Sequence, residues 1–390
     1  MQGVDKWVGF DNHRSPRSRS RSMSEPETLA EAALLITCLR GQPFTIPSNI
    51  DWHTLQALAA ENGVLLPVCR SLSEAGAAIP DFFASAAREC GVAAEIFSAE
   101  LESLLKEFAA QGIDALPLKG PVLAESLYGD AAMRQCNDLD LLVRGGDYPR
   151  AEALLLRLGF AASSEIDDYH RRFVRNGVPV ELHFGIAPSR YFPFDLDGVW
   201  RRSAEGTFRG SPMRVMSDDD LVLFLCLHGL KHGFSRLIWI LDVARALNRI
   251  RTGDYKALIQ RARREGQEAW LLIGCEVVRE MLPRQLPPGM DAAIAESPRM
   301  AERARRVVAQ MFAEDPKVIN EIRAFYLQTE RSARRRWRRR LSYLAPTPMD
   351  DQWMERYRIS RNLVPVLRPL RVLQKYGISR VWRTLFPPAA

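Results

Sequence analysis

The chain has 390 residues, a formal net charge of +7, 47% hydrophobic residues and 26% charged residues. This length and composition exclude a disordered or fibrous chain and predict a globular protein with two domains and additional tails. No apolar run is long enough to span a bilayer, and the first residues lack the apolar core of a signal peptide, so we expect a cytoplasmic protein. The six cysteines are scattered, which favours reduced thiols over a disulfide framework or a zinc knuckle.

The N-terminal segment is basic. The run RSPRSRSRS over residues 14–22 has no apolar residue to bury, so residues 1–23 are predicted to form a disordered basic arm. Met23 directly follows the run and is a candidate natural start of the protein.

Helical periodicity begins after this arm. Apolar residues recur at helical spacing over 26–40, 52–61 and 82–110, and Asp51 is a candidate cap for the second of these helices. We therefore expect an N-terminal helical layer over residues 24–110 that packs against a sheet.

A strand, a glycine turn and a helix follow in close succession. Residues 115–118 form a short apolar run, Lys119-Gly120-Pro121 comes next, and residues 122–128 are typical of a helix that ends at Gly129. Free backbone N–H groups at such a helix start face an anion, so this turn is a candidate phosphate cradle. Lys119 could add a positive charge there, or it could be an exposed lysine at the end of the strand.

The next apolar run carries two acidic residues. Asp138 and Asp140 flank Leu139 in a run that ends before Gly145-Gly146 and is typical of a buried strand. Side chains at i and i+2 leave a strand on the same face, so the two carboxylates repel each other unless a cation neutralises them. Such hard oxygen ligands suit Mg²⁺, although an Asp-x-Asp sequence alone is more often a solvated strand end.

A helix over 148–158 and a β-hairpin complete this part of the chain. Two strands, 170–174 and 178–184, surround the dipeptide Asn176-Gly177, which is a strong hairpin signal. The second strand places Glu181 and His183 on one face. Glu181 is a candidate third carboxylate, or it could pair with Arg172 across the hairpin. We expect residues 111–205 to form an α/β core with a mixed sheet and helices on one side.

The second half is helical by its period. Ser217 caps a predicted helix over 221–232, and His228 and His232 share one face of it. No glutamate lies between these histidines, so a structural or phosphate-facing role is favoured over zinc. Further helices are predicted over 237–250, 255–264, 268–281 and 298–312, which gives an α-helical domain over 206–330. Residues 331–390, which include RRRWRRR at 334–340, form a basic C-terminal region.

These motifs together resemble one known family. The uncharacterised bacterial nucleotidyltransferases of the DNA polymerase β-like superfamily are similar over roughly residues 30–320. The residues that carry the resemblance are Lys119-Gly120, Tyr128-Gly129, Arg134, Asp138-Leu139-Asp140, Glu181-Leu182-His183, Leu227-His228 and the stretch from His232-Gly233 to Asp242. The superfamily usually has Gly-Ser or Gly-Gly before its aspartate pair, whereas this chain has Gly120-Pro121. Proline has no N–H, so one phosphate donor is missing.

The resemblance implies a fold and an activity. The fold is α+β, with a small mixed β-sheet nucleotidyltransferase core, flanking N-terminal helices and a C-terminal α-helical domain. The activity is Mg²⁺-dependent transfer of a nucleoside monophosphate from an NTP to an unidentified acceptor, with a surface-polysaccharide or natural-product pathway as one setting. The implied catalytic and metal-binding residues are Asp138, Asp140 and Glu181. The implied nucleotide-binding residues are Lys119, Gly120, Arg134, His183, Lys231 and His232. Arg134 could instead form a salt bridge with Asp138.

One alternative has a different character. A non-catalytic nucleotide- or nucleic-acid-binding protein could retain this fold and use its basic tails for weak contact with nucleic acid or an anionic membrane. As a third possibility, residues 334–390 could dock on an anionic membrane and place a catalytic protein at the membrane periphery. A solvated charge run is the more common fate of such tails. No dinucleotide fingerprint, P-loop or Gly-x-Ser-x-Gly elbow appears in the sequence, so oxidoreduction and acyl hydrolysis have no support.

Overall fold

The computed structural model describes residues 30–166, 169–188, 192, 194–250, 255–283, 286 and 290–295, and the single positions 298, 302, 305 and 367. The predicted arm over 1–23 lies outside the described residues. The predicted helix over 298–312 and the basic region over 331–390 also lie outside them, apart from those single positions.

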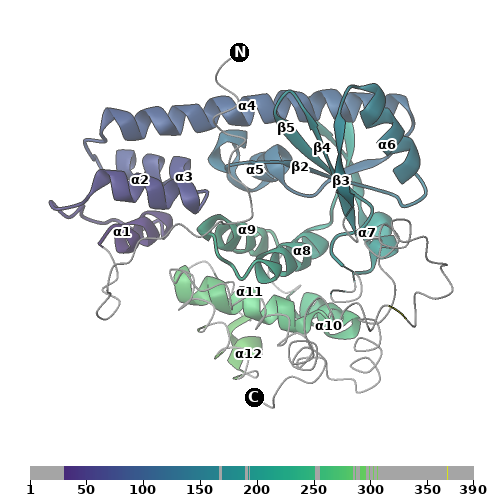
Figure 1. Ribbon diagram of the computed structural model, residues 1–390. Coiled ribbons are helices and arrows are strands. Elements are labelled where there is room, and N and C mark those ends of the chain that lie inside the picture. Colours follow the sequence, from purple (N-terminus) through teal and green to yellow (C-terminus); the bar gives the residue numbers. More distant parts are fainter. Residues whose placement is uncertain are drawn as a thin grey trace.

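Four helices precede the sheet: α1 (Ala30–Leu39), α2 (Trp52–Glu61), α3 (Leu65–Glu74) and α4 (Asp81–Ala110). The Asp51 side chain accepts a hydrogen bond from the backbone N–H of His53 and so caps α2, as its sequence predicts. Helix α4 spans the molecule, with its first half above α2 and α3 and its second half along the sheet (Figure 1). Helix α3 was not expected from the sequence.

The sheet has five strands: β1 (Ala115–Pro117), β2 (Leu139–Val143), β3 (Ala161–Ile166), β4 (His170–Arg175) and β5 (Val178–His183). Their order is β1-β2-β5-β4-β3, and β2 and β5 run parallel while every other neighbouring pair is antiparallel. Helix α5 (Gly120–Tyr128), a 3₁₀ turn (Ala131–Met133) and helix α6 (Tyr148–Arg157) connect the strands. The α+β class with a small mixed sheet is therefore confirmed.

The two faces of the sheet differ in character. One face is apolar and packs against the second half of α4 and against α6, through Leu139, Leu141, Val180 and Leu182. Strand alternation sends Asp140, Leu142, Glu181 and His183 to the opposite face. On that opposite face, Leu142 belongs to a second hydrophobic cluster, together with residues of α5 and of the later helices α8 (Asp218–Lys231) and α9 (Leu237–Leu247). Helices thus lie on both sides of the sheet rather than on one side as expected, and the polar residues lie between the sheet and the helical half.

Two hairpins have the same turn geometry but different sequence signals. Asn176-Gly177 joins β4 to β5 with φ of 50° and 77°, which confirms the expected hairpin. After α7 (Leu196–Arg202), a second hairpin of β6 (Ala204–Phe208) and β7 (Ser211–Val215) turns at Arg209-Gly210 with φ of 48° and 81°. Arginine is an unusual residue at such a position, so this hairpin was not expected. The expected boundary between residues 205 and 206 falls inside β6.

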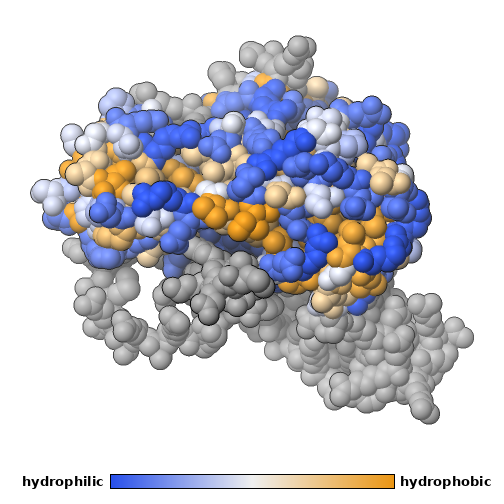
Figure 2. All heavy atoms as spheres, turned by 90° about the horizontal axis from the view of Figure 1, so that it is seen from above, coloured by the Kyte–Doolittle hydropathy of each residue, from blue (hydrophilic) through white to orange (hydrophobic). Residues whose placement is uncertain are grey.

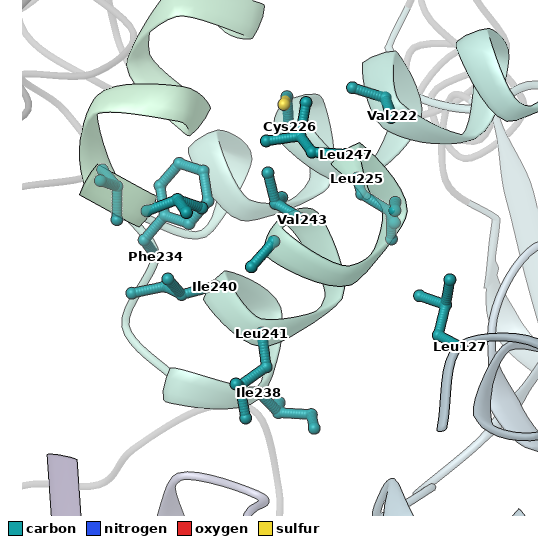
Figure 3. Close-up of a cluster of buried hydrophobic side chains, with 14 of the residues drawn as sticks. Leu127, Val222, Leu225, Cys226, Phe234, Ile238, Ile240, Leu241, Val243 and Leu247 are labelled. Atoms are coloured by element: carbon teal, nitrogen blue, oxygen red, sulfur yellow. The ribbon is translucent and has the colours of Figure 1, made fainter. Parts of the chain in front are cut away.

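The helical half consists of α8 (Asp218–Lys231), α9 (Leu237–Leu247), α10 (Tyr255–Glu265), α11 (Glu268–Met281) and α12 (Met290–Ala295). The Ser217 side chain accepts from the backbone N–H of Asp220 and caps α8, as predicted. Helix α8 is buried on every face over residues 220–230, because it lies between the sheet and α11 (Figure 1). Figure 3 shows Cys226 of α8 near Val243 and Leu247 of α9 in this core.

The surface on the side of α4 is mostly hydrophilic, with separate apolar patches (Figure 2). Val92, Ile96 and Leu156 are the large apolar side chains recorded as exposed in the described part of the chain. The same part contains no helix with the length and hydrophobicity needed to cross a bilayer.

Candidate active site

Parallel pairing of β2 and β5 builds the centre of the site. Asp140 and Glu181 are direct partners in this register, so their side chains leave the same face of the sheet beside each other. Asp140 is buried with 3% of its surface exposed, whereas Glu181 is half-buried. Two neighbouring carboxylates in such a place need positive charge near them to stay ionised.

His183 supplies part of that charge. Its Nε2 lies 3.2 Å from Oδ1 of Asp140 and 3.4 Å from Oε2 of Glu181. Its Nδ1 lies 3.1 Å from the carbonyl oxygen of Gly185, which can only accept a hydrogen bond, so Nδ1 carries a proton. Burial alone would lower the pKa of His183, but hydrogen bonds to Asp140 and Glu181 outweigh it and raise that pKa. The geometry therefore favours an imidazolium between two carboxylates.

Lys119 supplies the second positive charge. Its Nζ lies 3.0 Å from Oδ2 of Asp140, and only 14% of its side chain is exposed. Burial would lower the pKa of Lys119, but the charges of Asp140, Asp138 and Glu181 outweigh it and raise that pKa. Lys119 is therefore a buried partner of the carboxylates and not an exposed lysine at a strand end.

Asp138 lies immediately before β2 rather than within it. Burial and the neighbouring charge of Asp140 raise its pKa to about 6, and Lys119 opposes them. Asp138 thus lies close enough to Asp140 and Lys119 for their charges to affect its pKa. It is nevertheless outside the cluster of Asp140, Glu181 and His183, whose ligand atoms all lie within 4.8 Å of one another. The two carboxylates are hard oxygen donors that suit a divalent cation, and the protonated His183 lies between them.

The turn before α5 has the backbone of an anion cradle. Gly120 opens α5 with a φ of 72°, and a Cβ atom there would meet its nearest neighbours at 3.5 Å or more. The glycine is therefore required by the backbone angle and not by lack of space. No side chain caps this helix start, and Pro121 removes one of its N–H groups.

Arg134 forms a buried ion pair with a distant residue. Its Nε lies 3.0 Å from Oδ2 of Asp242 in α9, and its Nη2 lies 2.9 Å from the same oxygen. The Tyr128 hydroxyl at the end of α5 donates to Oδ1 of Asp242 at 2.8 Å. The alternative that Arg134 forms a salt bridge with Asp138 is wrong, because Arg134 pairs with Asp242 instead. The triad of Tyr128, Arg134 and Asp242 fastens α9 to the core.

The end of α8 approaches the site from the helical half. The rings of His228 and His232 lie 4.9 Å apart between centroids. Burial, together with positive neighbours that include Lys119 and Lys231, lowers the pKa of both histidines well below the ordinary value. Both histidines are therefore neutral imidazoles near pH 7. Lys231 donates from Nζ to the Tyr169 hydroxyl at 2.9 Å.

Two residues of the site were missed at the sequence level. The Nε2 of His170 in β4 lies 3.5 Å from Oε2 of Glu181, and its ring stacks on His183 with centroids 4.9 Å apart. The Tyr169 ring lies 4.5 Å from that of His170 and 5.7 Å from that of His183. The two-residue turn at Asn176-Gly177 fixes the register that sets His170 opposite His183, so the hairpin signal could have found it.

The site combines a glycine turn at the start of a helix with paired carboxylates on neighbouring strands of a small mixed sheet. The chain belongs to a family of uncharacterised nucleotidyltransferases, whose family model matches residues 48–283. The resemblance of the sequence to this family is thereby confirmed, and the protein is a transferase of this kind.

Solved structures of one aminoglycoside-resistance protein are also similar to part of this chain. The solution structure of the antibiotic-resistance factor ANT(2″)-Ia has a TM-score of 0.35 and 16% identity, and the match covers 44% of this chain and 94% of that chain. The crystal structure of ANT(2″)-Ia in complex with adenylyl-2″-tobramycin has a TM-score of 0.34 and 16% identity, with coverage of 43% and 97%. No curated protein matches the chain.

Proposed function

We propose that the protein is a Mg²⁺-dependent nucleotidyltransferase that uses an NTP and an acceptor hydroxyl and releases pyrophosphate. The observation that carries this proposal is the cluster of Asp140, Glu181 and His183, with ligand atoms within 4.8 Å of one another on the buried polar face of the sheet. Family membership supplies the class of reaction.

Asp138, Asp140 and Glu181 are proposed to hold the metal. Bound Mg²⁺ would supply charge neutralisation for the triphosphate and for the attacking oxygen. The carboxylates fit this role because hard oxygen donors suit Mg²⁺, and because the cluster otherwise depends on Lys119 and His183 for its positive charge.

The protein's own groups bind the reactants and move a proton. In the proposed reaction, the acceptor oxygen forms a bond to the α-phosphorus while the bond from that phosphorus to the bridging oxygen breaks, and pyrophosphate leaves. The proton of the acceptor hydroxyl goes to a carboxylate, for which Glu181 is our candidate because it is half-buried whereas Asp140 is buried. His183 would hold Asp140 and Glu181 in place through its Nε2.

Lys119 and the backbone at Gly120 are proposed to contact the phosphates, with Lys231 and His232 facing the nucleotide from the helical half. Arg134 contributes through its ion pair with Asp242, which fixes the segment that leads into Asp138. We further propose a hydroxyl of a small molecule or sugar as the acceptor, in a cytoplasmic setting where NTPs are abundant.

Calorimetric titration tests the nucleotide site. ATP, GTP, CTP and UTP are titrated with Mg²⁺ into the full chain, and pyrophosphate release is followed with candidate acceptors. We expect at least one NTP to bind in a metal-dependent manner and Asp140→Asn to abolish that dependence, because it removes an ionised ligand from the cluster.

Asp114→Asn is the matched control, because Asp114 is an exposed carboxylate one residue before β1. It should bind like the wild type. Nucleotide binding that persists in Asp140→Asn and without Mg²⁺ would favour a non-catalytic nucleotide-binding protein and would contradict the proposed reaction.

A further inference from the structure

The junction of α8 and α9 carries a group of aromatic rings. Trp239 in the first turn of α9 has its ring centroid 5.1 Å from that of His232 and 5.3 Å from that of His228. His228 is buried, with 8% of its surface exposed, whereas Trp239 and His232 are half-buried. Trp239 and His232 therefore form the accessible side of this group.

Two helix positions relate the rings to the candidate active site. Trp239 precedes Asp242 by one helical turn, so both lie on the same side of α9, and Asp242 holds Arg134 of the core. His232 lies near enough to Lys119 and Asp140 for both charges to affect its pKa. Trp239 thus shares one side of α9 with a residue that binds the core, and the charged groups of the candidate active site act on His232.

A hydrogen bond strengthens this placement. Lys231, the neighbour of His232, donates to the hydroxyl of Tyr169, whose ring lies against those of His170 and His183. The Lys231 ammonium also lies 4.9 Å from the centroid of the Tyr169 ring. The end of α8 therefore contacts Tyr169, which lies beside the polar face of the sheet.

The chemistry of the rings suits a flat aromatic ligand. Burial lowers the pKa of His232 well below its ordinary value, so its ring is neutral near pH 7 and offers a π-face rather than a cation. The Arg236 guanidinium lies over the Trp239 ring with its Cζ 5.8 Å from the ring centroid, so a planar cation also belongs to this group. All nucleic-acid bases can stack on such surfaces, whatever their pattern of hydrogen-bond donors and acceptors, because every base has a π-face.

We propose that Trp239 and His232 form the surface on which the aromatic base of the bound nucleoside triphosphate stacks. This inference rests on the proposed function, because it names the base subsite of the same nucleotide. The phosphates would then extend from the rings toward Lys119 and the start of α5. A stacking surface selects weakly among bases, so we expect several NTPs to bind with similar affinity.

The first experiment separates the base from the phosphates. Each NTP and inorganic tripolyphosphate are titrated with Mg²⁺ into the wild type, Trp239→Ala and Lys119→Met. We expect Trp239→Ala to weaken NTP binding by roughly 5- to 150-fold, the usual range for removing one stacked ring, and to leave tripolyphosphate binding unchanged. Lys119→Met should weaken the binding of both NTP and tripolyphosphate, because it removes a positive charge that acts on the phosphates.

The second experiment uses tryptophan fluorescence and does not depend on a destabilising variant. A base stacked on Trp239 should quench its emission, so NTP addition should quench the wild type and leave Trp239→Phe with little quenching. Trp52→Phe is the matched control, because Trp52 is also half-buried but packs on Phe83 in the N-terminal helices. It should retain the quenching of the wild type.

The outcomes distinguish the two proposals. If Trp239→Ala lowers affinity for NTP and tripolyphosphate equally, or if Trp239→Phe keeps the full quenching, the stacking surface is wrong while the proposed function stands. If no NTP binds the wild type with Mg²⁺, the proposed function fails and the base subsite fails with it.

Discussion

At the scale of single residues, Asp138 shows the electrostatic cost of the site. Burial and the charge of Asp140 raise its pKa to about 6 in the absence of metal. Between its ordinary value and about pH 6, the carboxyl is ionised in the unfolded chain but stays protonated in the folded protein. The folded state therefore loses stability as the pH rises through this interval, and the loss persists above it.

Asp138→Asn should accordingly stabilise the metal-free protein. We expect its Tm, measured by differential scanning calorimetry in EDTA, to exceed that of the wild type at about pH 7.5 and to approach it at about pH 4.5, since asparagine cannot ionise. Asp114→Asn should show no such pH-dependent gain, and Mg²⁺ should raise the Tm of the wild type more than that of Asp138→Asn. Equal gains at both pH values would contradict the proposed repulsion.

The sequence specified the residues of the site more fully than their partners. Asp140, Glu181 and His183 could be placed together because strand alternation and the Asn176-Gly177 turn are local signals. The partner of Arg134 could not be found in this way, because Asp242 lies 108 residues further along the chain. A pattern of short period contains no information about which distant helix supplies the opposite charge.

At the scale of elements, the same distinction separates the two hairpins. The dipeptide Asn176-Gly177 predicts its turn, whereas Arg209 adopts a positive φ that its residue type does not predict. The parallel pairing of β2 with β5 was also not specified, because a helix and two strands separate them in sequence. Burial of the apolar face of both strands against α4 and α6 selects that pairing.

The ion pair between Asp242 of α9 and Arg134, which lies between α5 and β2, gives a second testable consequence. Asp242 is fully buried with Arg134, and removing its charge would leave the Arg134 guanidinium without its partner. We expect Asp242→Asn to lower the free energy of unfolding by about 3–5 kcal/mol, as measured by urea denaturation. The double substitution Arg134→Met/Asp242→Leu should recover most of this loss, because it removes both buried charges.

If the double variant loses less free energy of unfolding than Asp242→Asn, the unpaired charge of Arg134 is the cause of the loss. If the double variant is instead the less stable one, the ion pair itself stabilises the interface and unpaired charge is not the source of the loss. NTP affinity of the double variant then reports whether the position of α9, and with it Trp239, depends on this attachment.

At the scale of the whole molecule, the helices on both sides of the core share one hydrophobic cluster. It contains side chains of the N-terminal helices, such as Leu35 and Phe83, of β2 and α5, such as Leu142 and Leu127, and of the helical half, such as Leu258. The sequence predicted separate segments over 24–110, 111–205 and 206–330 because periodicity describes each helix by itself. A core shared between these segments arises only when they pack.

We therefore predict that these segments unfold together. Phe83→Ala in α4 and Leu258→Ala in α10 each empty a fully buried position of the same cluster, and each should cost about 2–5 kcal/mol. Because the cluster is continuous, both substitutions should lower the midpoint of one common thermal transition, followed by far-UV circular dichroism and by tryptophan fluorescence. Two transitions, of which Phe83→Ala shifts one and Leu258→Ala the other, would show that the N-terminal helices and the helical half are independent folding units.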